Sequence, residues 1–300
     1  MPLVVVGSIA YDSVKTPHGS VERAVGGSAV YFSLAARHFS GVRLVGVVGD
    51  DFAEEDRACL RVENIDSEGV VTVEGGKTFR WSGEYLEDMN QRVTLSVELN
   101  VLEDFEPVLP DTYRDSRFVF LANAAPATQA SVLDQVDAAQ FVMADTMDLW
   151  IQTAHAELLA LLTRIDGLMV NDSEALLLTD TRHILEAGRA ILDLGPRLVV
   201  VKKGEHGAIL FTPDEIVPLP AFPVESVTDP TGAGDSFAGA FMGHVAQCGD
   251  ATPRTLRQAL AHGAVAASFT VEDFGPRSLL DLDRATMDVR FEHYRRLLQF

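Results

Sequence analysis

Short runs of consecutive apolar residues recur along this chain and alternate with longer segments that have helical spacing. The runs lie at residues 3–6, 42–48, 118–121, 141–144, 168–170 and 198–201. Such runs are typical of strands buried on both faces, and strands that alternate with helices form parallel sheets. The pattern therefore predicts an α/β fold: a doubly wound, mostly parallel sheet with helices on both faces.

The segment 70–101 departs from this pattern, because its apolar residues alternate with polar ones in steps of two. Period two indicates antiparallel strands with one face open to solvent. Residues 12–25 mix Pro, Gly and charged side chains and suggest short extended structure. We therefore expect one domain spanning residues 1–300, with a small β-sheet built from about 12–25 and 70–101 inserted in it. A hairpin near 208–219 and helices after residue 232 complete the expected fold.

Charge and composition limit the partners of the chain. It has 300 residues and a formal net charge of −20, so it lacks the basic balance that binding to nucleic acid or to an anionic membrane requires. No apolar stretch approaches the about 18 residues that span a membrane. The two cysteines are far apart and no secretory signal is present, which favours the cytoplasm. An anionic ligand would need local positive groups that outweigh the global field.

The segment Asp-Pro-Thr-Gly-Ala-Gly-Asp at residues 229–235 carries the strongest chemical signal. Gly232 and Gly234 leave backbone N–H groups unobstructed where a helix begins, and such groups bind anions. Asp235 would lie beside the anion, where it is placed to accept a proton from an incoming hydroxyl. The structural alternative is a capping turn with an acid in the first turn of the helix.

Together with residues 236–241, this string strongly resembles the C-terminal signature of the ribokinase-like (PfkB) family of carbohydrate and nucleoside kinases. Further matches follow in family order along nearly the whole chain. They are GSIAYD at 7–12, GGSA at 26–29, NDSE at 171–174 and KKGEHG at 202–207.

The resemblance implies transfer of the γ-phosphate of ATP to an alcohol group. Asp235 would be the general base, and the backbone N–H groups of Gly232, Ala233 and Gly234 would hold the developing negative charge. Glu174 would act on Mg²⁺ through water. Asp229 lies where members that use a monovalent cation, such as K⁺, place a ligand.

The remaining site residues are also implied by the resemblance. Those expected at the nucleotide are Asn171, Lys202, Gly204, Gly207, Thr231 and His262, the last at a position that often meets the adenine. Those expected at the substrate are Asp12, Gly26, Gly27, Ser28 and Tyr31. The small β-sheet would be a lid that closes over the site and excludes water.

Two departures from the family pattern bear on the substrate. Lys202 replaces a threonine and adds positive charge near the phosphates. Tyr31 stands where ribokinases have an asparagine for the sugar, and an aromatic side chain there suits stacking on a base or a ring. Together with the aromatic residues of the expected lid strand at 79–85, Tyr31 favours a nucleoside of the adenosine or inosine type. A sugar of the ribose, fructose or 2-keto-3-deoxygluconate type is the alternative.

Structural alternatives remain at this stage. Asn171 and Glu174 have the spacing of a helix-capping arrangement, and His262 has the surroundings of a packing residue. A non-catalytic nucleotide-binding regulatory protein is a second alternative function. The one-sided strands of the lid would either cover the site alone or pair with the lid of a second subunit, so a homodimer through the lid is one of two open arrangements.

Overall fold

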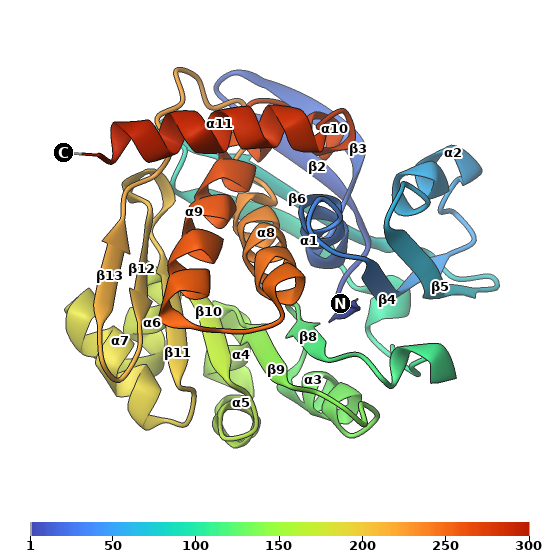
Figure 1. The fold of residues 1–300 in the computed structure, drawn as a ribbon. Coiled ribbons are helices and arrows are strands. Elements are labelled where there is room, and N and C mark those ends of the chain that lie inside the picture. Colours follow the sequence, from blue (N-terminus) through green and yellow to red (C-terminus); the bar gives the residue numbers. More distant parts are fainter. Residues whose placement is uncertain (1, 300) are drawn as a thin grey trace.

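The apolar runs form a large sheet that crosses the molecule (Figure 1). The computed structural model describes residues 2–299, and within them this sheet has nine strands in the order β13-β12-β11-β10-β9-β8-β1-β4-β5. Their bounds are β1 (Leu3–Val6), β4 (Val42–Gly49), β5 (Ile65–Val73), β8 (Phe118–Leu121), β9 (Phe141–Asp145), β10 (Gly167–Asn171), β11 (Leu198–Lys202), β12 (Ala208–Phe211) and β13 (Ile216–Leu219). All neighbours from β5 to β11 are parallel, and β12 and β13 add an antiparallel edge. The predicted, mostly parallel sheet is confirmed.

Helices cover both faces of the large sheet because successive side chains of each strand point to opposite sides. In β1, Leu3 and Val5 belong to one buried cluster, whereas Val4 and Val6 belong to the other. The first cluster packs against α1 (Ser28–Ala36), α8 (Ala233–Cys248), α9 (Pro253–Thr270), α10 (Arg277–Leu280) and α11 (Arg284–Leu297). The second packs against α3 (Pro126–Leu133), α4 (Asp148–Thr153), α5 (His155–Leu162), α6 (Asp172–Thr179) and α7 (Ile184–Asp193). A short helix, α2 (Glu54–Arg57), follows β4.

A second, smaller sheet has the strand order β3-β2-β6-β7. Its strands are β2 (Ala10–Thr16), β3 (Gly19–Gly26), β6 (Phe79–Tyr85) and β7 (Arg92–Glu98). The β2–β3 and β6–β7 pairs are antiparallel, as predicted, whereas β2 and β6 are parallel. We call these four strands the small sheet.

The predicted start of the second insertion segment, at residue 70, is wrong. Residues 70–73 belong to β5, which pairs in parallel with β4 and forms the edge of the large sheet. Val71 and Val73 alternate with polar residues because β5 is an edge strand whose end is exposed to solvent. Alternation alone does not distinguish a half-exposed edge strand of one sheet from a strand of another.

Two helices, α1 and α8, pack closely and begin side by side. Gly239 of α8 lies against the backbone carbonyl of Phe32 in α1, and a Cβ atom at position 239 would overlap this carbonyl. A Cβ atom at Gly243 would lie 3.0 Å from the carbonyl oxygen of Ala36. Gly27 precedes α1 and Gly232 precedes α8, and both have positive φ angles, 97° and 77°. The start of α1 and the start of α8 therefore lie together at one end of the molecule.

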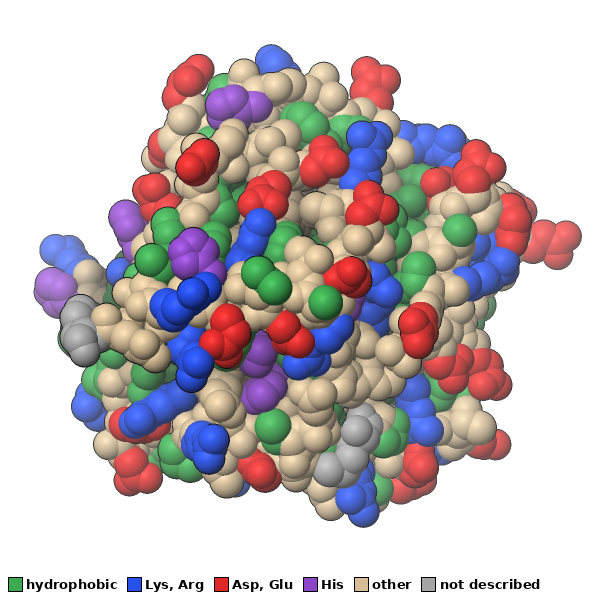
Figure 2. All heavy atoms as spheres, turned by 45° about the horizontal axis from the view of Figure 1, so that its top comes forward, with side chains coloured by type: hydrophobic (Ala, Val, Ile, Leu, Met, Phe, Trp, Pro, Cys, Tyr) green, Lys and Arg blue, Asp and Glu red, His purple; other side chains and the backbone are tan. Residues whose placement is uncertain are grey.

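Among residues 2–299, no helix combines the length and apolar character needed to cross a membrane. Figure 2 shows acidic and basic side chains interspersed on the face that carries α11. With a net charge of −20, positive charge at a ligand site must come from individual side chains and backbone N–H groups.

Candidate active site

Three polar side chains end neighbouring parallel strands of the large sheet. Asn171 ends β10 and lies directly opposite Lys202, which ends β11. Asp145 ends β9 and lies opposite Met169 of β10. In open α/β sheets ligands bind outside the carboxyl ends of the strands, so this edge is where a site is expected.

The loop that leads into α8 lies at the same end. Asp229 is 1% exposed, and its carboxylate accepts hydrogen bonds from the N–H groups of Thr231 (2.9 Å) and Gly275 (3.3 Å). These bonds shape the loop so that Gly232, with its φ of 77°, precedes the first turn of the helix without a side-chain cap. The N–H of Ala233 donates to the carbonyl of Pro230, so this predicted anion donor is already engaged. Gly232 and Gly234 remain our candidates for holding an anion.

Asp235 lies in the first turn of α8 and is partly buried. Burial raises the pKa of its carboxyl, and the positive charges of Lys202 and Arg92 act in the opposite direction. Lys202 approaches this turn from β11, since its Nζ lies 3.0 Å from where a Cβ at Gly234 would stand. Asp235 is therefore a carboxylate held beside an anion-binding helix start, next to two cations.

Asp12 of β2 faces the same loop from the small sheet. Its side chain is 5% exposed, accepts a hydrogen bond from the N–H of Gly27, and leaves no room for a Cβ at Gly26. Burial, together with the charges of Asp229 and Asp235, raises the pKa of Asp12 to about 7. The structure thus brings the predicted substrate carboxylate and the predicted base together.

Two predicted substrate residues have different surroundings from those we expected. Ser28 is buried, and its hydroxyl and N–H are both bonded to Ser8 (3.1 and 3.0 Å), which ties α1 to the end of β1. Tyr31 is 1% exposed and its ring lies against Gly232, where a Cβ would overlap it. The hypothesis that Tyr31 stacks on a substrate ring is therefore wrong for this structure, because the ring is covered by the loop before α8.

The hydroxyl of Tyr31 is buried without a hydrogen-bond partner among residues 2–299. Burial raises the pKa of Tyr31 well above its usual value, and the charges of Asp12, Asp229 and Asp235 raise it further. The ring of Tyr31 therefore packs against the loop, and the tyrosine lies within the electrostatic field of Asp12, Asp229 and Asp235.

Asp145 is a site residue that the sequence analysis missed. It is 5% exposed, and its Oδ1 atom has no hydrogen-bond partner within residues 2–299. Burial raises its pKa well above the usual range; the charge of Lys202 opposes this shift, and those of Asp235 and Glu174 add to it. The available signal was an acid placed directly after the apolar run 141–144.

Asn171 and Glu174 form a capping box at the start of α6. The Asn171 side chain accepts from the N–H of Glu174, and Glu174 accepts from the N–H of Asn171, both at 2.8 Å. The capping alternative is thus correct as a description of local structure. It also places the Glu174 carboxyl near Lys202. Burial raises the pKa of Glu174, and the positive charge of Lys202 acts in the opposite direction.

The carboxylates near Lys202 suit a magnesium ion. Mg²⁺ prefers oxygen ligands and keeps several waters, and the unpartnered Oδ1 of Asp145 is a free oxygen donor beside Glu174. Within residues 2–299, no three His, Cys, Asp or Glu side chains are arranged as a preformed metal cage. The donor set therefore fits an ion that arrives with nucleotide phosphates and is held partly through water.

The small sheet contacts both loops of the site. Tyr85 of β6 accepts a hydrogen bond from the Thr231 hydroxyl (3.3 Å). Asn90, in the turn after β6, donates to Glu205 (3.2 Å), and its Oδ1 lies 2.7 Å from where a Cβ at Gly204 would stand. Gly204 and Gly207 have φ angles of 53° and 88°, so the predicted nucleotide loop needs glycine at both positions.

Arg92, the first residue of β7, is a further site residue that the sequence did not indicate. It lies opposite Tyr85 in the β6–β7 ladder, and its charge lowers the pKa of both Asp235 and Glu174. An arginine on an exposed strand has no sequence signal of its own. Only the pairing of β7 with β6 brings it to the site.

His262 does not belong to this site in the structure. Its ring stacks on that of Phe291 with 4.0 Å between centroids, the His244 ring lies at 4.6 Å, and His262 is only 6% exposed. Burial lowers its pKa to about 3. The expectation that His262 meets an adenine is wrong here, because aromatic side chains occupy the space around it.

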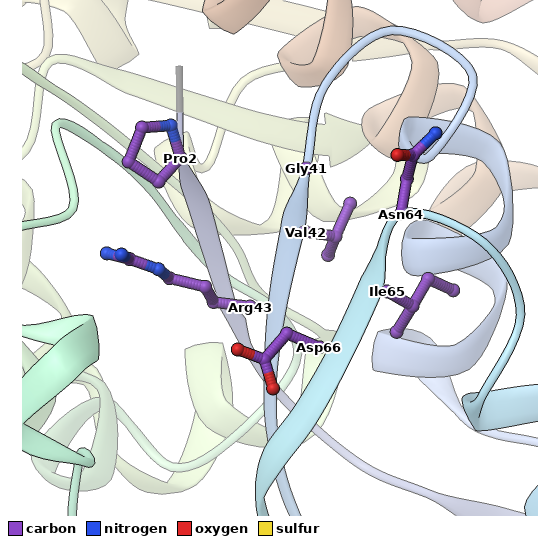
Figure 3. A pocket seen from close by; sticks show the side chains of 7 residues that line it. All are labelled: Pro2, Gly41, Val42, Arg43, Asn64, Ile65 and Asp66. Carbon is purple, nitrogen blue, oxygen red and sulfur yellow. The ribbon is translucent and has the colours of Figure 1, made fainter.

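Figure 3 shows a hollow at the amino ends of β4 and β5, away from the carboxyl ends of the strands where the candidate site lies. It is lined by Pro2, Gly41, Val42, Arg43, Asn64, Ile65 and Asp66. The amino ends of the strands carry none of the residues described above, so this hollow is separate from the candidate site.

A carboxylate in the first turn of a helix, a lysine among carboxylates and a glycine-rich loop at one end of a parallel sheet are the arrangement expected of an enzyme that transfers a phosphoryl group to a hydroxyl. The model of the pfkB family of carbohydrate kinases matches residues 2–282. The chain therefore belongs to this family and is an ATP-dependent kinase of a nucleoside or a sugar. The family assignment supports a kinase over the non-catalytic regulatory alternative.

Individual relatives agree with this assignment. The chain is 28% identical over 286 residues to a cytidine kinase from Thermococcus kodakarensis, which covers 93% of this chain and 99% of the relative. The fold is similar to that of Burkholderia thailandensis nucleoside kinase in complex with inosine, with a TM-score of 0.78, 21% identity and 97% of each chain covered. It is equally similar to an Escherichia coli structure assigned as a ribokinase II with ATP and Mg²⁺ bound, with a TM-score of 0.78, 18% identity and coverage of 97% and 99%.

Proposed function

We propose that this kinase phosphorylates an alcohol group of a nucleoside. The observation that carries the proposal is the meeting of Asp12 and Asp235 beside the loop of Gly232, because it gives an acceptor hydroxyl a binding carboxylate and a base at one place. The relative named as a cytidine kinase and the similar fold that holds inosine support a nucleoside rather than a sugar. A sugar kinase is the alternative, since the matching family model is that of the pfkB family of carbohydrate kinases.

In this proposal Asp235 takes the proton of the acceptor hydroxyl as the oxygen attacks the γ-phosphate. The N–H groups of Gly232 and Gly234 and the start of α8 hold the charge that develops on the phosphoryl oxygens. Such a donor is typically worth about 2.7–4 kcal/mol of barrier. Lys202 adds a positive charge at the same place.

The nucleotide would lie along the loop of Gly204 and Gly207, with Asn171 and Thr231 beside its phosphates. Mg²⁺ would be held by Glu174 through water and by Asp145, and it neutralises phosphate charge when bound. For Asp229 we keep the proposal that it is a ligand of a monovalent cation such as K⁺, in addition to its observed role in shaping the loop.

We also propose that the reaction takes place in the cytoplasm. The chain has two free cysteines, of which Cys248 is exposed, and free thiols are typical of a reducing compartment.

The small sheet would act as the lid. Contacts of Tyr85 with Thr231 and of Asn90 with Glu205 support this proposal, because they join the small sheet to the substrate side and the nucleotide side of the site. Arg92 would then bring a positive charge to the phosphates when the lid closes. Closure would exclude water that otherwise takes the phosphoryl group.

A panel of nucleosides and sugars tests the proposed function. With ATP and Mg²⁺, formation of ADP should depend on a nucleoside such as cytidine, inosine or adenosine, and ribose or fructose should give little turnover. Turnover of sugars without turnover of nucleosides would reject the nucleoside proposal and leave the kinase assignment intact.

The acceptor kcat/KM is expected to fall as the pH drops through 7. Asp12 has a raised pKa of about 7, so it is charged and accepts hydrogen bonds above this pH and is neutral below it. At pH 6 only about a tenth of the carboxyl is ionised, and kcat/KM should be about tenfold lower than at pH 8. Initial rates at limiting acceptor and saturating ATP give this profile. The Asp12→Asn variant should lack the step; a step near pH 7 that persists in the variant would assign it to another group.

The exposed strand β7 is our proposed contact between two subunits. All seven of its residues are exposed, and Val93, Leu95 and Val97 are 48%, 58% and 52% accessible at the edge of the small sheet. An exposed apolar edge strand is suited to pair with a second copy. We expect sedimentation to show a dimer that Leu95→Glu converts to monomer. A monomeric parent protein at micromolar concentration would contradict this arrangement.

A further inference from the structure

The pairing of the small sheet places an aromatic ring next to Asp12. Trp81 of β6 is the direct partner of Asp12 on β2 and of Val97 on β7. Directly opposed residues of a sheet project to the same face. Trp81 therefore lies on the face that carries Asp12, which is the face turned toward Asp235 and the loop before α8.

The indole of Trp81 lies across the strand rather than standing away from it. A Cβ at Gly83 would overlap its benzo ring at Cη2 and Cζ2, so the glycine at this position makes room for the ring. Tyr85, a further two residues along the same face, reaches Thr231. The ring thus lies over β6 at Gly83, between the position opposite Asp12 and Tyr85, which contacts the loop that would hold the phosphates.

The indole of Trp81 is partly exposed and has two close neighbours. Trp81 is only partly buried, although its neighbours Gly83 and Tyr85 are buried. The Arg92 guanidinium lies 5.8 Å from its ring centroid, a separation typical of a cation–π contact. The backbone at Gly83 and the Arg92 guanidinium therefore both lie against the indole, and a base that stacks on the ring would share it with Arg92.

We infer that Trp81 is the residue on which the base of a nucleoside stacks while Asp12 binds its sugar hydroxyls. This inference rests on the proposed nucleoside kinase function and deepens it. Neighbouring strands lie about 4.8 Å apart, a separation of the same order as that between the sugar hydroxyls and the base of a nucleoside. Stacking tolerates different bases because every base has a π face, so Trp81 selects a flat ring without selecting one base. The role first assigned to Tyr31 is thereby transferred to Trp81.

The chain contains two tryptophans, which makes a direct binding measurement practical. Trp150 lies in α4, where its indole N–H donates to Asn123 (3.0 Å), and Trp150→Phe leaves Trp81 as the single indole. Titration of this active variant with cytidine, inosine or adenosine, without ATP, should quench and shift the emission of Trp81. Ribose at the same concentrations should not. A nucleoside that is phosphorylated but leaves the emission unchanged would overturn the inference.

Kinetics of two variants give an independent test. Trp81→Leu should raise the KM for the nucleoside about tenfold or more and leave the KM for ATP within about threefold. Trp81→Phe should retain most of the affinity, because a smaller ring still stacks. Ser82→Ala, one residue along β6 and on the opposite face, is the control and should behave as the parent.

Gly83→Ala tests the position of the ring without removing it. The added methyl group displaces the indole, so the nucleoside KM should rise as in Trp81→Leu. Melting temperatures and ATP binding show which variants are folded. Trp81→Leu and Gly83→Ala variants that are folded and have the parent's nucleoside KM would overturn the inference while the proposed function stands. Phosphorylation of sugars alone would reject the proposed function, and the inference with it.

Discussion

Asp235→Asn is expected to lower kcat by at least about 100-fold, the low end for general-base catalysis. The amide keeps the shape of the side chain at the start of α8 but does not accept the proton of the acceptor hydroxyl. Because the anion donors are backbone groups of Gly232 and Gly234, the affinity for ATP should stay within a few-fold. Coupled detection of ADP measures the first quantity, and calorimetry with ATP and Mg²⁺ measures the second.

A matched variant separates this effect from the loss of one negative charge. Asp281→Asn removes a carboxylate from an exposed position after α10 and should behave as the parent protein. If Asp235→Asn retains the parent kcat, Asp235 is not the base, and the buried carboxylate of Asp145 becomes the next candidate.

Lys202→Met is expected to lower kcat by about 100- to 1,000-fold, the range for losing one electrostatic donor at a transition state. Lys202 lies among Asp145, Glu174 and Asp235 and opposes the burial-raised pKa of each. Without its charge, the pKa of Asp235 rises further, so a higher pH is needed to ionise the base. The acid limb of the kcat–pH profile should therefore move to higher pH.

The neighbouring Lys203 provides the control for Lys202. Its substitution by Met removes the same charge one residue after the end of β11 and should leave the pH profile in place. A Lys202→Met variant that loses kcat without any shift in the profile would show that the lysine acts on the nucleotide and not on the carboxylates.

Most of the fold could be predicted because a strand buried on both faces has a simple sequence pattern. The runs that became β1, β4 and β8 to β11 consist almost entirely of apolar residues, so their type and their alternation with helices were evident. β5 could not be assigned, because an exposed edge strand and a strand of the small sheet have the same alternation. The pairing partner, which the pattern does not encode, decides between them.

The site was predicted where the chemistry is local in sequence. Gly232, Gly234 and Asp235 are neighbours in sequence, and the structure places them at the start of one helix, as predicted; their roles stay a prediction. Residues that depend on contacts between distant segments were missed or misassigned. Arg92 reaches the site only through the register of β7, and His262 is covered by side chains from other helices, including Phe291 of α11.

The close contact of α1 with α8 has a consequence for how the two reactants are aligned. Gly27 at the start of α1 donates to Asp12, and Gly232 at the start of α8 begins the phosphate loop, so each helix carries one reactant's binding group. At Gly239 and Gly243 the backbones of the two helices approach without side chains between them, so we expect the two helices to move together. Under the proposed function, the separation between Gly27 and the loop of Gly232 would then stay constant while the small sheet moves. Under the proposed function, release of products would depend on the small sheet, which carries Asp12 and joins the site through the hydrogen bonds of Tyr85 with Thr231 and of Asn90 with Glu205.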